Sequence, residues 1–258
     1  MSLNKGGALG LAERRMLSVA KAILLDWDGC IAIGNRILPA AKRLIMQYPG
    51  RVAIVSNNST DLPIDLAAIL TRHEVTFPQD RIFLAGVEAM KDLAQAGAKR
   101  VMLLSAPKIR TLAGELGIPL VSDNPDVLVL MRDARFTYAK LEKAANALRR
   151  GARLVVANAD LTHPGRANRV VPETGALLAA LLACTGDSGI EPRVIGKPGP
   201  LLFERACRHL AVDPEQAVMI GDNPETDGEG ALRLGIQPIL IGGASSLRLE
   251  HLLEPITA

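Results

Sequence analysis

Eight short apolar runs constrain the fold of this chain more than any other feature of its sequence. The runs are Ala22–Leu25, Val52–Val55, Arg100–Leu104, Val127–Met131, Leu154–Ala157, Arg193–Ile195, Ala217–Ile220 and Pro238–Ile241. Apolar residues follow one another in these runs without polar alternation, which is typical of strands buried on both faces of a parallel sheet. The pattern therefore predicts a parallel sheet that is covered on both sides.

Helical segments lie between the apolar runs. The clearest is Tyr138–Arg150, with Thr137 as a plausible N-cap and Gly151 directly after its end. Another helix is predicted over about Asp61–Arg72, and a third follows Pro200. Strands that alternate with helices over the whole length indicate an α/β fold with a Rossmann-like, doubly wound parallel sheet.

Composition excludes several classes of protein. The 30 Lys and Arg residues nearly balance 27 Asp and Glu residues, and aromatics make up only 3%, so we expect no nucleic-acid partner. Three scattered cysteines favour neither a disulfide framework nor a zinc site. The longest apolar stretch, Ala176–Cys184, is about half the length of a membrane-spanning helix. We therefore expect a cytoplasmic protein with no membrane partner.

Polar side chains stand where four of the predicted strands end. These are Asp26 and Asp28, Ser56 and Asn57, Lys197, and finally Asp222 and Asp227. Singly, each has an ordinary explanation, because Asp and Ser often cap helices or form turns and a loop lysine is usually solvated. Together they are more specific, since ligands of doubly wound sheets bind outside the carboxyl ends of the strands.

Charge favours a metal ion at these strand ends. Asp26, Asp28, Asp222 and Asp227 would place up to four negative charges in one crevice, which is unfavourable unless protons or a cation offset them. Oxygen ligands suit Mg²⁺, which commonly binds one or two carboxylates together with phosphate oxygens. A Mg²⁺ ion with Lys197 would favour a phosphate group.

These residues resemble the motifs of haloacid dehalogenase-like phosphatases. The motifs occur in order as Asp26-Trp27-Asp28-Gly29, Ser56-Asn57-Asn58, Gly196-Lys197-Pro198, and Gly221-Asp222 with Asp227 five residues further on. About 137 residues separate Thr60 from Lys197, which is too long for a loop and resembles a C2-type cap domain. Segments 133–141, 157–160 and 174–177 resemble the NagD-like and 4-nitrophenylphosphatase-like subgroup. The chain departs from the related sequences at Cys30 and at Glu173, where the cap helix is usually preceded by Gly.

The resemblance implies a domain order and a role for each motif residue. The core would span residues 1–98 and 193–258, with an inserted α/β cap over 99–192. Asp26 would be the nucleophile and Asp28 the general acid and base. Ser56 and the Asn57 amide would hold a phosphoryl oxygen, and Lys197 would offset charge. Asp26, the Asp28 carbonyl and Asp222 would bind Mg²⁺, with Asp227 as an outer or water-mediated partner.

Substrate choice would lie in the cap. Asn158, Asp160, His163 and Pro164 resemble the loop that faces the substrate in related phosphatases. An equally plausible alternative is that His163 is an exposed loop histidine and Pro164 ends a strand.

We therefore predict a Mg²⁺-dependent phosphatase that hydrolyses a small-molecule phosphate monoester through an aspartyl-phosphate. The partner would be a small phosphorylated metabolite, and the resemblance implies a homodimer through the cap. The alternative is a non-catalytic or regulatory protein that binds phosphometabolites on the same scaffold. A response-regulator-like receiver also places Asp and Lys at strand ends, but it would need about half this length and no inserted domain.

Overall fold

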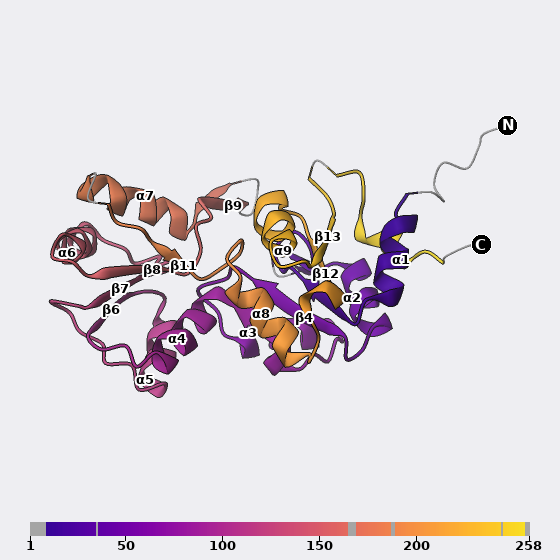
Figure 1. Ribbon diagram of the computed structural model, residues 1–258, viewed down its shortest axis with the longest axis horizontal. Helices are drawn as coiled ribbons and strands as arrows, with labels where there is room; N and C mark the ends of the chain where they lie inside the picture. The colour runs from indigo at the N-terminus through magenta and orange to yellow at the C-terminus, as the bar shows by residue number, and fades with distance from the viewer. Residues whose placement is uncertain (1–8, 35, 165–168, 187–188, 244, 256–258) are drawn as a thin grey trace. The chain divides into compact units, whose positions relative to one another are not determined.

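The chain forms two compact α/β units, seen in a computed structural model that describes residues 9–34, 36–164, 169–186, 189–243 and 245–255 (Figure 1). Unit 1 comprises residues 1–56, 63–83 and 198–258. Unit 2 comprises residues 57–62 and 84–197. The boundaries that we infer from the sequence, at residues 98/99 and 192/193, stay a prediction.

Unit 1 is built on one five-stranded sheet in the order β13-β12-β1-β4-β5. Its strands are β1 (Ala22–Leu25), β4 (Val52–Ser56), β5 (Ile82–Leu84), β12 (Ala217–Gly221) and β13 (Gln237–Leu240). Pairing of β1 with β4 and β12, and of β12 with β13, is parallel. The chain first adds β4 and β5 on one side of β1 and later adds β12 and β13 on its other side. The strand order therefore reverses between β1 and β12.

Helices and short turns surround this sheet. They are α1 (Leu11–Val19), α2 (Pro39–Gln47), α3 (Pro63–Arg72), α8 (Leu201–His209), α9 (Gly230–Leu232), the 3₁₀ turns η1 (Gln79–Arg81), η3 (Pro214–Gln216) and η5 (Leu249–Leu253), and the π-helical turn η4 (Pro224–Glu229). Helix α8 packs against β1 and β4, while η4 packs against β12 and β13. A small hairpin of β2 (Ala32–Ile33) and β3 (Arg36–Ile37) follows β1.

Unit 2 has its own parallel sheet in the order β11-β8-β7-β6. Its elements are α4 (Ala85–Gln95), β6 (Val101–Leu104), α5 (Pro107–Glu115), β7 (Val127–Leu130), α6 (Tyr138–Arg149), β8 (Arg153–Val156), α7 (Thr174–Thr185), β11 (Arg193–Val194) and an antiparallel hairpin of β9 (Thr162–Pro164) and β10 (Val170–Pro172). In Figure 1, α6 and α7 lie on one side of this sheet and α4 and α5 on the other.

Side chains of successive residues in the unit 2 strands point to opposite faces of the sheet. Met102, Leu128 and Leu154 pack with residues of α6 and α7 in one apolar cluster. Their neighbours Leu103 and Val129 are equally buried. Because successive strand side chains point to opposite faces, burial of both sets requires cover on both sides. This is why the strands read as unbroken apolar runs.

The predicted secondary structure is largely confirmed. All eight predicted strands are present, and every boundary agrees within one residue. In α6, Thr137 accepts a hydrogen bond from the Lys140 amide at 3.3 Å, and Gly151 adopts a φ of 95° just after the helix. Among the described residues, no helix combines the length and the apolar character that a membrane crossing needs.

The three cysteines differ in burial, which predicts their reactivity. Cys30 and Cys207 are buried, and burial raises the pKa of the Cys207 thiol to about 11, whereas Cys184 is exposed. Only the thiolate reacts with alkylating reagents, so at pH 8 iodoacetamide should label the native chain once and the urea-unfolded chain three times. Mass spectrometry of the labelled peptides would check this, and fast native labelling of Cys207 would contradict it.

Candidate active site

Three carboxylates of unit 1 converge where the strand order of its sheet reverses, between β1 and β12. One oxygen each from Asp26, Asp222 and Asp227 lies within 4.8 Å of the other two. The parallel register pairs Leu25 with Ile220, and the Asp26 amide donates to the Ile220 carbonyl at 2.9 Å. The residues that follow β1 and β12 therefore emerge side by side, although they are nearly two hundred positions apart in sequence.

Two glycines allow the carboxylates to approach this closely. Gly29 has a φ of 81°, and a Cβ there would lie 2.2 Å from Asp222 Oδ2. A Cβ on Gly221 would lie 2.1 Å from Asp227 Oδ2. A larger residue at either position would displace these carboxylates. Their close approach therefore requires glycine at both positions, and the positive φ of Gly29 favours glycine there as well.

A backbone amide holds one carboxylate of this cluster, that of Asp227. The Asn223 amide donates to Asp227 Oδ2 at 3.1 Å, and Asp227 is 1% exposed. The Asn223 side chain accepts from the amides of Glu225 and Thr226, which fixes the start of η4. Asp26 is 7% exposed, so two buried carboxylates and a half-buried one face each other. Such a set needs a cation or protons, and its oxygen atoms suit a hard divalent ion.

The other predicted core residues of unit 1 lie at the same strand ends. Asp28 is exposed in the turn that follows β1, where its backbone pairs with Ala32. Ser56 is the last residue of β4, which neighbours β1, and it is 1% exposed.

Asn57 is the centre of a hydrogen-bonded cluster in unit 2. Its Oδ1 accepts from the Lys197 amide at 2.7 Å, and its Nδ2 donates to the Lys197 carbonyl and to Asp160 Oδ2, both at 3.0 Å. Asn158 Nδ2 donates to the Asn57 carbonyl at 2.8 Å, and Asn158 Oδ1 accepts from the Asp160 amide at 3.2 Å. The structure thus brings four predicted residues together, and Lys197 itself is 2% exposed.

His163 has a partner that the sequence analysis does not anticipate. Its Nδ1 lies 2.6 Å from Glu173 Oε1, and Arg132 Nε lies 3.5 Å from the same oxygen. Burial raises the pKa of the Glu173 carboxyl, while Arg132 and His163 oppose that shift. Pro164 is the last residue of β9, and residues 165–168 beyond it lie outside the described chain.

The sequence analysis names neither Arg132 nor Ser59, and it notes Glu173 only as a departure from the related sequences. The Ser59 hydroxyl accepts from the Arg132 amide at 3.2 Å and lies 3.5 Å from the Thr174 hydroxyl. Only Glu173 leaves a signal in the sequence, because it replaces the glycine of the related proteins.

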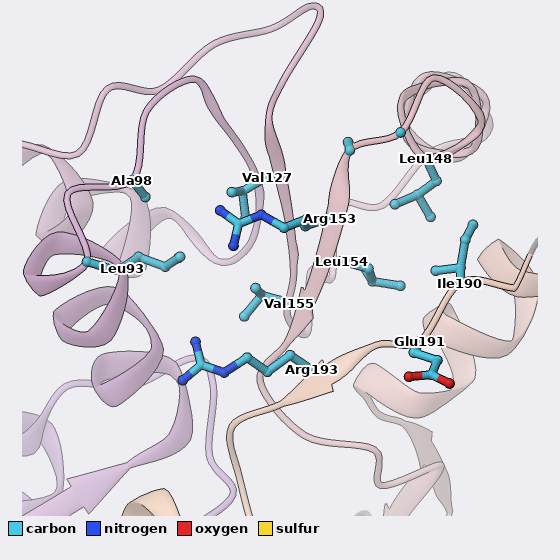
Figure 2. Close-up of a pocket in the computed structure, with 13 residues that line it drawn as sticks. Leu93, Ala98, Val127, Leu148, Arg153, Leu154, Val155, Ile190, Glu191 and Arg193 are labelled. Atoms are coloured by element: carbon cyan, nitrogen blue, oxygen red, sulfur yellow. The ribbon is translucent and has the colours of Figure 1, made fainter.

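A separate hollow in unit 2 contains none of these residues. It has a volume of about 440 Å³ and is lined by the ends of α4, α6, β7 and β8 and the segment leading into β11. In Figure 2, the side chains of Arg153 and Arg193 lie on one side and those of Leu154 and Ile190 on the other. Arg193 is already paired with Asp92 at 2.6 Å, so we assign the candidate active site to the strand-end residues instead.

Comparisons with known proteins agree with this assignment of the fold. A model of the haloacid dehalogenase-like hydrolase family matches residues 20–235. The chain is 28% identical over 229 residues to a dihydroxyacetone phosphatase of Corynebacterium glutamicum, covering 87% of this chain and 82% of that protein.

Two solved structures are similar over most of the chain. A 4-nitrophenylphosphatase from Thermotoga maritima has a TM-score of 0.85 at 25% identity, covering 94% of this chain and 99% of that one. A glycerol phosphate phosphatase from Mycobacterium tuberculosis in complex with magnesium has a TM-score of 0.78 at 28% identity, covering 88% and 69% respectively.

The Asn57 cluster predicts a stability cost for its loss. Asn57→Ala removes the acceptor of the Lys197 amide and the donor to Asp160, so the free energy of unfolding should fall by about 2–4 kcal/mol in urea titrations. Asn146→Ala is the matched control, because its amide bonds only on the exposed side of α6, and it should change stability by less than about 0.5 kcal/mol. Equal losses of stability in the two variants would contradict a stabilising role for the Asn57 cluster.

Proposed function

The chain belongs to the haloacid dehalogenase-like hydrolase family, and on this basis we propose a Mg²⁺-dependent phosphatase that works through an aspartyl-phosphate on Asp26. It is a phosphoric monoester hydrolase with NagD-like and 4-nitrophenylphosphatase-like relatives. The observation that carries the proposal is the group of carboxylate oxygens from Asp26, Asp222 and Asp227 within 4.8 Å. A small phosphorylated metabolite would be the substrate.

The proposed metal fits these residues. Three carboxylates that repel one another, two of them buried, form an all-oxygen donor set, and the missing Cβ of Gly29 leaves room for Asp222. Asp26, Asp222 and the Asp28 carbonyl would hold Mg²⁺, with Asp227 directly or through water. When bound, the ion would neutralise charge on the phosphoryl group and the nucleophile. The related magnesium complex supports this choice of ion.

In the first half-reaction, an Asp26 oxygen attacks phosphorus and the bond to the ester oxygen breaks. Asp28 gives its proton to the departing alcohol. In the second, water attacks the phosphorus of the aspartyl-phosphate, Asp28 takes the water proton, and inorganic phosphate leaves Asp26. The exposure of Asp28 suits a group that must meet both the alcohol and water.

Ser56 and the Asn57 amide would hold a phosphoryl oxygen during both steps, and Lys197 would balance negative charge. The two hydrogen bonds that the half-buried Asn57 side chain makes to the Lys197 backbone support a positioning role for Asn57. Asn158 and Asp160 would extend that support, while His163 and Pro164 would contact the leaving group. The homodimer through the cap and the cytoplasmic location stay predictions.

Asp26→Asn should lower the kcat for p-nitrophenyl phosphate at least about 1,000-fold, because an amide is a poor nucleophile. Its circular dichroism spectrum and Tm should stay close to wild type. Asp213→Asn, a matched change at an exposed residue of unit 1, should keep full activity. Turnover by the Asp26 variant at the wild-type rate would refute the mechanism, and no turnover by wild type would favour the binding protein.

Removal of the metal should abolish activity and lower stability. With excess EDTA, hydrolysis should stop and Tm should fall, because bound Mg²⁺ stabilises only the folded chain and offsets the repulsion of three carboxylates. Asp222→Asn should raise the Mg²⁺ concentration for half-maximal activity by about tenfold or more. Hydrolysis that is unaffected by EDTA would rule out the metal.

A further inference from the structure

A hollow of about 440 Å³ in unit 2 is lined by no residue of the proposed phosphatase mechanism. Its walls come from the end of α4, the starts of β7 and β8, the end of α6 and the segment that leads into β11. Its volume lies within the range of about 300–1,000 Å³ that small-molecule sites usually have. Because every lining residue belongs to unit 2, this unit forms the hollow by itself.

The hollow lies where the edge of the unit 2 sheet is incomplete. Strand β8 pairs with β7 along all four of its residues, but β11 pairs only with Val155 and Val156. Within the described part of the chain, Arg153 and Leu154 therefore have no strand partner on the β11 side. Pro192 directly precedes β11, and proline is disfavoured inside a strand, which explains why β11 starts so late. The open half of this edge is one wall of the hollow.

One side of the hollow is aliphatic. In Figure 2, the Leu154 side chain points towards Leu148 and Ile190. Leu148 and Leu154 are 4% and 3% exposed, and both belong to the apolar cluster that α6 and α7 form with the sheet. An apolar part of a ligand placed here would leave water, which favours binding in proportion to the apolar area that becomes buried.

The other side carries two arginines whose charges are balanced differently. Arg193 donates to both carboxylate oxygens of Asp92, at 2.6 and 3.2 Å, so its charge is already offset. Arg153 is exposed, and its side chain forms neither an ion pair nor a hydrogen bond with any residue that the structure describes. A guanidinium presents parallel N–H donors that match the two oxygens of a carboxylate. Arg153 is therefore the group at which an acidic ligand would bind.

Positive charge prevails around the hollow. Lys99, Arg149 and Arg150 are exposed, and each adjoins a lining residue in the sequence. Glu191 is the acidic residue of the lining. An excess of cations raises the local concentration of anions, so the surroundings favour a negatively charged ligand.

We propose that this hollow is a second ligand site, which binds a small amphipathic carboxylate of the medium-chain fatty acid class. The carboxylate lies at Arg153, and the aliphatic chain packs against Leu148, Leu154 and Ile190. A singly charged head group matches the one lining arginine, among the described residues, whose charge is not offset. The inference goes beyond the proposed phosphatase function and does not depend on it.

Octanoate is the probe, titrated into the full chain at pH 7.5 in the presence of Mg²⁺. Calorimetry should give a Kd for octanoate at least about tenfold lower than that for acetate, because acetate keeps the charge but lacks the aliphatic chain. In ¹H–¹⁵N NMR spectra, octanoate should shift the amide signals of Gly151, Leu154 and Ile190 and leave that of Asp26 unchanged.

Arg153→Gln should raise the Kd for octanoate about two- to fivefold, because it removes an exposed ionic partner. Arg135→Gln, the same change at another exposed arginine of unit 2, should leave this Kd unchanged. Ala98→Trp should abolish measurable binding, because the ring would occupy the hollow. Ala139→Trp, at an exposed position of α6 that does not line the hollow, is its matched control and should bind octanoate normally.

An octanoate Kd no lower than that of acetate, an unchanged Kd in Arg153→Gln, undiminished binding by folded Ala98→Trp, or amide shifts centred on Asp26 would each overturn the inference. The Tm of each variant shows whether it has folded. Arg153→Gln changes an exposed side chain, so its result decides the charge contact even if Ala98→Trp does not fold. Absence of phosphatase turnover in a chain that binds octanoate would refute the proposed function alone.

Discussion

Mutual repulsion of three carboxylates is the constraint on which this structure depends. Asp26, Asp222 and Asp227 present oxygens within 4.8 Å, and two of them are buried. They are held there by parallel pairing of β1 with β12 and by the Asn223 amide on Asp227. The favourable free energy of folding thus keeps three carboxylates together that would move apart in an unfolded chain. Because the carboxylates repel one another, a cation is a favourable partner for them.

In unit 2, the polar side chains of Asn57 and Glu173 have their hydrogen-bond and ion-pair partners within the same unit. Asn57 satisfies both the amide and the carbonyl of Lys197, and Asp160 accepts from Asn57. Glu173 likewise serves Arg132 and His163. Buried polar groups are tolerated when each has a partner, and such groups have few alternative positions. Unit 1 therefore concentrates charge, whereas unit 2 supplies positioned donors and acceptors.

Sequence patterns predict the layers of this protein well and its contacts less well. The strand runs from Ala22–Leu25 to Pro238–Ile241 are found within one residue, because burial on both faces leaves an unbroken apolar signature. The short β5 strand is missed, since Ile82–Leu84 is only three residues long. His163 is identified as a candidate, but its pairing with Glu173 depends on the β9–β10 hairpin and on the start of α7, which no local pattern encodes.

The sequence by itself determines the α/β layers, the order of the four motifs and the chemical types of their residues, because burial period and side-chain chemistry are local properties. Only the tertiary structure decides that Asp26 meets Asp222, that Gly29 must lack a Cβ, and that Asn57 holds the backbone of Lys197. These contacts join residues far apart in the chain, and the register of parallel strands together with close packing sets their distances.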